Sequence, residues 1–171
     1  MDRLFQRGFG KRSGVISMIC NSTPLILLAR INKLELLKKL FGTITIPEDV
    51  KKEVIVENKP GFIVLNNAIK DKWIRIRNPK NNKELNLGKG ENAAINLAME
   101  AKDKLIIDDA VGIRVAQELN IETLRTTTII FMALKKKIIN KEDAIELINK
   151  LIENGYYISN EYYAKILTKL K

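Results

Sequence analysis

Residues 18–29 read Met-Ile-Cys-Asn-Ser-Thr-Pro-Leu-Ile-Leu-Leu-Ala. The first three residues, Met18 to Cys20, are apolar and typical of a short buried strand. Thr23 and Pro24 suit the N-cap and the first position of a helix, and Leu25 to Leu40 continue the helical pattern. A strand that runs almost directly into a helix is the repeating unit of an α/β fold.

The same alternation continues along the chain. Further strands are predicted at Thr43–Ile46, Trp73–Arg77, Leu105–Ile107 and Ile121–Leu124. Further helices are predicted from Pro47 through Glu53, then at Phe62–Ile69, Glu91–Lys102, Ala110–Leu119, Thr126–Ile139, Lys141–Glu153 and Asn160–Leu170, the last two capped by Asn140 and Ser159. The polar segment 78–86 is expected to be an exposed loop. Strands rich in Ile and Leu with helices between them indicate a mostly parallel sheet covered on both faces, with its functional groups at the carboxyl ends of the strands.

Length and composition favour one compact domain that binds a polyanion. The chain has 171 residues, 46% of them hydrophobic, and a formal net charge of +10. Such a charge attracts RNA or DNA, although lysine-rich solvated helix faces give the same count. Histidine is absent, which excludes imidazole catalysis, Ser-His-Asp triads and zinc sites with His ligands. The single cysteine, Cys20, excludes an intrachain disulfide and is expected to be a small apolar strand residue.

The N-terminal segment differs from the rest. Residues 1–17 are basic, contain three glycines and lack periodicity, so we expect a flexible arm that either contacts RNA or reflects a start codon chosen upstream of Met18. Residues 18–171 are expected to form the folded domain. No apolar run is long enough to span a membrane, and residues 1–17 lack the features of a signal peptide, so we expect a cytoplasmic protein without a membrane partner.

Four side chains with oxygen ligands lie at element boundaries. Asn21 and Asp108 each follow a predicted strand, while Glu53 and Glu91 lie on helices that connect neighbouring strands. Taken singly, they have structural explanations as a turn former, a solvated helix residue, a helix N-terminal charge and a cap. If they converge, they make a site for Mg²⁺, because a cluster of carboxylates needs a cation to neutralise it.

The order and local sequence of these residues resemble the PIN domain, in particular a prokaryotic branch related to the toxin ribonucleases of toxin–antitoxin systems. The resemblance covers about residues 18–171. It rests on Asn-Ser-Thr-Pro-Leu-Ile-Leu-Leu-Ala (21–29), Ile-Pro-Glu-Asp-Val-Lys-Lys-Glu-Val (46–54), Leu-Gly-Lys-Gly-Glu-Asn-Ala-Ala-Ile (87–95) and Leu-Ile-Ile-Asp-Asp-Ala-Val-Gly-Ile-Arg-Val-Ala (105–116). The tail Asn-Gly-Tyr-Tyr-Ile-Ser-Asn-Glu-Tyr-Tyr (154–163) is also similar to that branch.

The resemblance implies a Rossmann-like sheet whose acidic quartet binds Mg²⁺ or Mn²⁺ and hydrolyses RNA phosphodiesters, a nuclease chemistry that needs no histidine. Carried over, the quartet is Asn21, Glu53, Glu91 and Asp108, with Glu53, Glu91 and Asp108 as metal ligands. Asp109 is implied as an alternative ligand, and Thr23, Arg114 and Thr126 as neighbours of the metal or the scissile phosphate; a surface ion pair is an equal explanation of Arg114. A small antitoxin protein and a homodimer are also implied.

Position 21 departs from the family, which has Asp where this chain has Asn. The amide keeps a carbonyl oxygen but removes one negative charge, so metal affinity is expected to fall. Losing a carboxylate ligand is expected to cost several kcal/mol of transition-state stabilisation. Each 1.4 kcal/mol lost slows the reaction about tenfold. A natural pseudo-enzyme, an alteration introduced to allow expression of a toxic protein, and a native site that tolerates the amide all fit the sequence.

Three other functions compete with the nuclease. The leading one keeps the fold without the chemistry, as a catalytically silent module that binds nucleic acid or a protein partner. Nucleotide binding would favour a glycine-rich turn after the first strand, where this chain has Asn-Ser-Thr-Pro. A phosphoreceiver would place its acidic pair earlier than Asp108 and Asp109.

Overall fold

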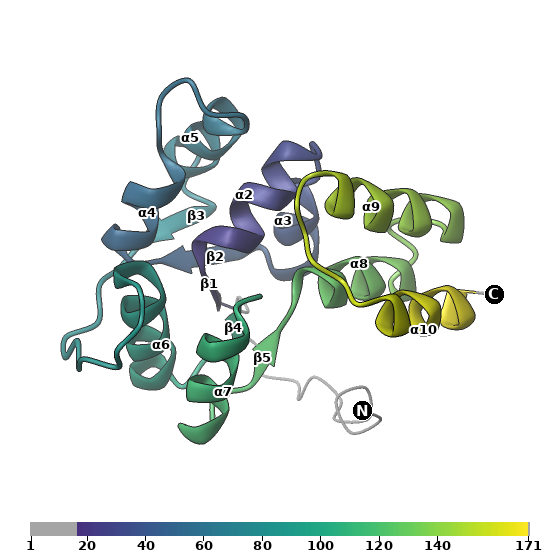
Figure 1. The fold of residues 1–171 in the computed structure, drawn as a ribbon. Coiled ribbons are helices and arrows are strands. Elements are labelled where there is room, and N and C mark those ends of the chain that lie inside the picture. The colour runs from purple at the N-terminus through teal and green to yellow at the C-terminus, as the bar shows by residue number, and fades with distance from the viewer. Residues whose placement is uncertain (1–16, 171) are drawn as a thin grey trace.

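The computed structural model describes residues 17–170, which are built on a five-stranded sheet with the order β3-β2-β1-β4-β5 (Figure 1). All four strand pairings in these residues are parallel. The strands are β1 (Ser17–Cys20), β2 (Thr43–Ile46), β3 (Ile74–Ile76), β4 (Leu105–Ile106) and β5 (Thr123–Leu124). The predicted α/β fold is confirmed. The predicted arm lies outside the described residues, apart from Ser17, which begins β1.

Helices fill every connection between the strands. They are α2 (Ser22–Arg30), α3 (Glu35–Phe41), α4 (Glu48–Val54), α5 (Phe62–Lys70), α6 (Lys89–Ala101), α7 (Ala110–Glu118), α8 (Thr126–Lys135), α9 (Lys141–Glu153) and α10 (Asn160–Leu170). Helices α6 and α7 lie on the lower side of the sheet in Figure 1, and α2, α3 and α5 on the upper side. Helices α8, α9 and α10 form a group beyond β5, where α8 packs against α3 and α9.

The prediction of one helix from Leu25 to Leu40 is wrong. Helix α2 ends at Arg30, and Asn32 adopts a left-handed conformation with φ of 54°. The Lys33 N–H donates to the Leu28 carbonyl at 2.8 Å and the Asn32 N–H donates to the Ala29 carbonyl at 3.1 Å, the two bonds of a Schellman ending. Asparagine tolerates this conformation better than most residues. The apolar periodicity continues across the break, which is why the pattern predicted a single helix.

Helix α8 also ends earlier than predicted, at Lys135 instead of Ile139. Lys137 has φ of 57°, and the Ile138 N–H donates to the Ala133 carbonyl at 2.9 Å, so the same type of ending occurs without a glycine or an asparagine to signal it. Helix α6 begins at Lys89, after Gly88, two residues before the predicted start. The predicted cap of α9 is confirmed, because the Asn140 side chain accepts from the Asp143 N–H at 2.7 Å.

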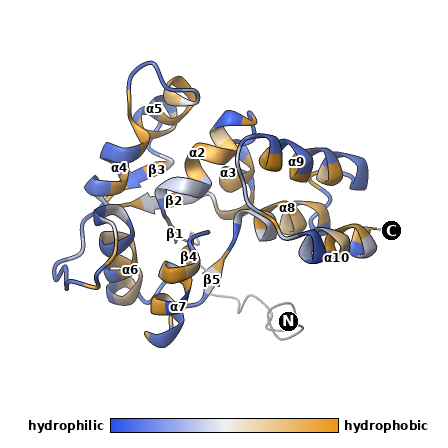
Figure 2. Ribbon diagram, viewed as in Figure 1, coloured by the Kyte–Doolittle hydropathy of each residue, from blue (hydrophilic) through white to orange (hydrophobic). Residues whose placement is uncertain are grey.

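The core lies on both faces of the sheet. Apolar side chains of β1, β2 and β4 are buried. Figure 2 shows that the helices carry both hydrophobic and hydrophilic residues, as expected of helices with one buried face. Cys20 is fully buried in β1, as predicted. No helix within residues 17–170 is long and apolar enough to cross a membrane.

Candidate metal centre

Three of the predicted site residues follow directly on strands of the parallel sheet. Asn21 follows β1, Asp108 lies just after β4, and Thr126 begins α8 after β5. The Asn21 N–H donates to the Ile106 carbonyl at 2.9 Å, which continues the pairing of β1 with β4. Parallel strands end at the same edge, so these side chains share the edge where α/β folds place their sites.

Asp108 and Thr126 are in direct contact. The Thr126 N–H donates to Oδ1 of Asp108 at 2.9 Å, and the Thr126 hydroxyl donates to Oδ2 at 2.6 Å. A third donor, the hydroxyl of Tyr156, lies 2.9 Å from Oδ1. Thr126 is fully buried. Its N–H is one of the first-turn N–H groups that have no acceptor within the helix. Asp108 accepts from this N–H, and the same hydrogen bond fixes the Asp108 carboxylate against the start of α8.

Burial dominates the electrostatics of Asp108. It raises the pKa of this carboxyl above its ordinary value, although the hydrogen bonds from Thr126 and Tyr156 lower it. The positive charge of Arg125 also lowers the pKa of Asp108, by a smaller amount. Cys20 is a neighbour, because its thiol pKa is raised first by burial and then by the negative charge of Asp108. The buried thiol is therefore protonated and is a poor metal ligand.

Glu53 and Glu91 are brought together by the packing of α4 against α6. The Gly90 N–H donates to Oε1 of Glu53 at 3.2 Å. Glu91, the next residue, accepts from the Gly88 N–H through Oε2 at 3.2 Å. A Cβ atom at position 90 would lie 2.5 Å from Oε1 of Glu53, so only glycine allows this approach. Both glycines of the Gly-Lys-Gly-Glu segment thus donate an N–H to a carboxylate.

The pKa of Glu91 records its acidic surroundings. Burial raises this pKa, and the negative charges of Asp109 and Glu53 raise it further, whereas the Gly88 N–H lowers it. Asn21 has a smaller lowering effect. Residues at the starts of α2 and α7 and on α4 therefore lie near Glu91. Like charges at close range are costly unless protons or a cation neutralise them.

Asn21 is the unusual member of the group. Its side chain is 1% exposed, and neither Oδ1 nor Nδ2 makes a hydrogen bond of regular geometry. A weak hydrogen bond from the Asn21 amide group to the Glu91 carboxylate still lowers the pKa of Glu91, which leaves Oδ1 as the atom without a partner. Leaving a buried polar group unsatisfied costs about 1–3 kcal/mol. A buried amide oxygen at the edge of a carboxylate group has the chemistry of a ligand for a hard divalent cation.

The remaining predicted residues have other surroundings. Asp109 caps α7 by accepting from the Gly112 N–H at 2.6 Å, and its charge still acts on Glu91. Thr23 is exposed on the first turn of α2. Arg114 is exposed on α7 and forms no ion pair with another described residue, so the surface ion pair is not the explanation of this arginine. Its contact with the scissile phosphate stays a prediction.

Two residues were missed by sequence reasoning. Tyr156 entered the sequence analysis only as part of the tail 154–163, because nothing in a sequence reveals which tyrosine reaches across 48 positions to a carboxylate. Gly90 entered it only as part of the segment 87–95. The signal that could have identified it is the Gly-Glu pair at the start of a helix, because a glycine there lets another side chain come close to the backbone next to a carboxylate.

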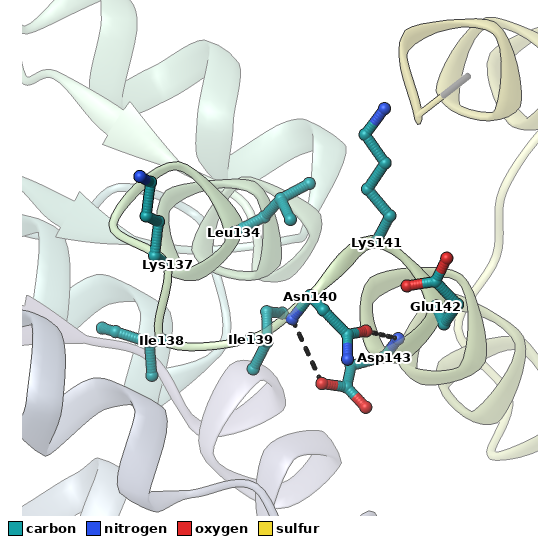
Figure 3. Close-up of a pocket in the computed structure, with 8 residues that line it drawn as sticks. All are labelled: Leu134, Lys137, Ile138, Ile139, Asn140, Lys141, Glu142 and Asp143. Atoms are coloured by element: carbon teal, nitrogen blue, oxygen red, sulfur yellow. Dashed lines mark hydrogen bonds between the residues drawn. The ribbon is translucent and has the colours of Figure 1, made fainter.

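The donor set fits a hard divalent cation in its chemistry. Carboxylates and a partnerless amide oxygen are the ligands such ions prefer. The carboxylates are not drawn together around one point: within residues 17–170, no three His, Cys, Asp or Glu side chains are close enough to hold a metal ion as they stand. A recess at the α8–α9 turn, lined by Leu134 and residues 137–143, contains none of the predicted site residues (Figure 3).

Comparison with known proteins decides the family. A family model described as a PIN domain matches residues 17–171. The chain belongs to the PIN domain family. One solved PIN-type structure that it resembles is a PilT N-terminus domain protein from the hyperthermophilic archaeon Sulfolobus solfataricus P2, with 19% sequence identity and a TM-score of 0.46, over 66% of this chain and 89% of that chain. None of the curated proteins compared with the chain matches it.

Membership confirms the predicted resemblance to the PIN domain, whereas the branch related to toxin ribonucleases stays a prediction. PIN domains have a nuclease-type fold, generally depend on divalent metal ions and generally bind nucleic acid. In this PIN domain, the polar group at the carboxyl edge of the sheet comprises Asn21, Glu53, Glu91, Asp108 and Asp109, and we refer to it below as the acidic edge.

Proposed function

We propose that this PIN domain is a metal-dependent endoribonuclease whose activity is limited by Asn21. The observation that carries the proposal is the amide oxygen of Asn21, which is buried without a hydrogen-bond partner beside Glu91. A buried amide in that state is expensive unless something else binds its oxygen. Glu53, Glu91 and Asp108, with Oδ1 of Asn21, would hold Mg²⁺ or Mn²⁺. The bound cation would supply positive charge at the scissile phosphate and activate water for attack.

The residues of the chain have separate tasks in this proposal. Thr126 and Tyr156 fix the orientation of Asp108, and the Gly90 N–H fixes Glu53. Burial and the charges of Asp109 and Glu53 raise the pKa of Glu91, so a bound cation would favour the ionised form of this carboxyl. The net charge of +10 favours RNA as the substrate class, since it concentrates a polyanion around the protein.

Cleavage of a labelled mixed RNA pool in Mn²⁺ tests the proposal. We expect weak cleavage by the chain, cleavage at least about tenfold faster with Asn21→Asp, and no cleavage with Asp108→Asn or with EDTA. Asp71→Asn is the matched control, because it removes one exposed carboxylate at the end of α5 and should cleave like the parent. Metal-independent cleavage, or equal rates for the parent and Asp108→Asn, would contradict the proposal.

The second candidate is a catalytically silent module that binds RNA. It is favoured by the neutral residue at position 21 and by the open spacing of the carboxylates among the described residues. This module would bind RNA with an affinity that falls steeply with salt, at a slope of about −0.7 per phosphate neutralised on single strands. It would bind equally well with Mn²⁺ or EDTA. For such a module, the Asn21→Asp variant would not cleave RNA.

We also propose, from the resemblance to toxin ribonucleases, that a small antitoxin covers the acidic edge by placing a basic side chain among its carboxylates. Burial and mutual repulsion at Glu91 favour such a charge. Purification of the tagged protein from its native cells should recover a small partner that the Glu91→Gln form retains less well. Recovery of this chain alone, or as a homodimer, would count against the antitoxin.

A further inference from the structure

We propose that Tyr156 is a positioning residue that orients Asp108 and thereby makes the connection between α9 and α10 part of the site. The inference deepens the proposed nuclease function and rests on it for its catalytic consequence. Its first support is the hydrogen bond from the Tyr156 hydroxyl to Oδ1 of Asp108 at 2.9 Å. Tyr156 is 8% exposed, whereas the adjacent Tyr157 is 87% exposed, so one tyrosine of the pair is selected for the interior.

The backbone explains that selection. Helix α9 ends in a Schellman motif, in which the Tyr156 N–H donates to the Leu151 carbonyl at 2.9 Å and the Gly155 N–H donates to the Ile152 carbonyl at 3.0 Å. Gly155 has φ of 89°, a conformation that L side chains rarely adopt. The chain therefore reverses at Gly155 and directs the next residue back toward the sheet.

The contact also restricts what Asp108 can bind. A carboxylate offers about four acceptor positions, two on each oxygen. Oδ1 accepts from the Thr126 N–H and from Tyr156, and Oδ2 accepts from the Thr126 hydroxyl. About one position remains, on Oδ2. Tyr156 and Thr126 together thus leave Asp108 a single oxygen for a monodentate contact, the mode that suits the octahedral geometry of Mg²⁺ better than the larger shell of Ca²⁺.

A metal-free measurement tests the positioning role. The Thr126 N–H has Asp108 as its partner, so its hydrogen exchange, followed by NMR, reports whether Asp108 stays in place. We expect Tyr156→Phe to speed exchange at Thr126 by about tenfold. Exchange of the Asn21 and Ile107 amides, which donate to the Ile106 and Leu124 carbonyls, should stay unchanged. Tyr163→Phe is the matched control, since it removes a hydroxyl that donates to the Asn149 side chain at 2.7 Å.

Unchanged exchange at Thr126 in Tyr156→Phe would overturn the proposal, as would equal acceleration at all three amides or in Tyr163→Phe. In RNA cleavage, Tyr156→Phe should lower kcat by about tenfold with KM unchanged, and cleavage at the parental rate would overturn its role at the site. If Thr126 exchange responds to Tyr156→Phe while no form of the protein cleaves RNA, the positioning role stands and the nuclease function fails.

Discussion

At the scale of single residues, a substitution at Gly90 can displace the Glu53 side chain without changing Glu53 itself. An added methyl group would lie 2.5–2.7 Å from the Glu53 carboxylate, which is the flexible end of its side chain and can give way. We predict that Gly90→Ala leaves the free energy of unfolding within about 1 kcal/mol of the parent, because alanine favours helices. RNA cleavage should fall by about tenfold to a hundredfold as Glu53 is displaced.

A double-mutant cycle shows whether Gly90→Ala acts through Glu53. The double variant Gly90→Ala/Glu53→Gln should cleave RNA no more slowly than Glu53→Gln alone, because one interaction cannot be lost twice. Additive losses in the two single variants would mean that the methyl group disturbs something other than the Glu53 contact. Denaturant unfolding of all four proteins is the control for folding.

At the scale of elements, helix α6 holds the polar loop 78–86 through two asparagines one turn apart. The Asn96 side chain, 1% exposed, accepts from the Lys83 N–H at 3.2 Å and donates to the Lys83 carbonyl at 2.9 Å. Asn92 accepts from the Leu85 N–H at 2.7 Å and also donates to the Lys83 carbonyl at 2.9 Å. The loop has exposed residues, as predicted, but its backbone is tied to α6.

We predict that Asn96→Ala lowers the free energy of unfolding by about 2–3 kcal/mol, because it strips partners from loop backbone groups. Limited proteolysis should cut within residues 78–86 faster in this variant than in the parent. Asn81→Ala, at an exposed position in the same loop, is the control and should change neither measurement. Equal protease resistance of Asn96→Ala and the parent would show that the asparagines do not hold the loop.

An element is predicted well from the sequence when it depends on local residues, and poorly when it depends on tertiary packing. Strands and the Asn140 cap of α9 depend on local patterns, so β1, β2 and this cap were predicted well. The prediction of Thr23 as the N-cap of α2 is wrong, because the helix begins at Ser22 after Asn21. The ends of α2 and α8 depend on left-handed residues, Asn32 and Lys137, inside continuing apolar patterns. The contact between Tyr156 and Asp108 depends on how α9 packs, and no local pattern contains that information.

The candidate site shows the same division. Asn21, Asp108 and Thr126 could be predicted to share an edge because each follows a strand of one parallel sheet. The hydrogen bond between Gly90 and Glu53 arises from the packing of α4 against α6. The burial of the Asn21 oxygen without a partner also depends on tertiary packing and not on local sequence. Sequence therefore predicted the members of the acidic edge but not the contacts that hold them.

At the scale of the whole molecule, the acidic edge makes stability depend on pH with a sign opposite to that of most acids. Burial first, and then the charge of Asp109, raise the pKa of Glu91 above 4.5. The folded protein therefore binds this proton more tightly than the unfolded chain, so the stabilisation is present at low pH and is lost as pH rises through the raised pKa. Asp108 contributes with the same sign.

We predict that Glu91→Gln has a higher Tm than the parent near neutral pH in metal-free buffer, and that the difference disappears as pH falls below the pKa of Glu91. The glutamine keeps an oxygen that can accept from the Gly88 N–H, so helix α6 keeps its start. Thermal unfolding between about pH 4 and 8 measures the difference. A parent as stable as the variant at neutral pH would mean that Glu91 is not under electrostatic strain.

Calorimetric titration of Mn²⁺ into this chain, beside its Asn21→Asp form, tests the central claim most directly. If the acidic edge is a metal site weakened by the amide, the Asp form binds one or more Mn²⁺ ions at least about tenfold more tightly than the chain itself, because a carboxylate adds the missing charge. Asp108→Asn should abolish binding in both forms. If neither form binds Mn²⁺, the acidic edge is not a metal site and the account is contradicted.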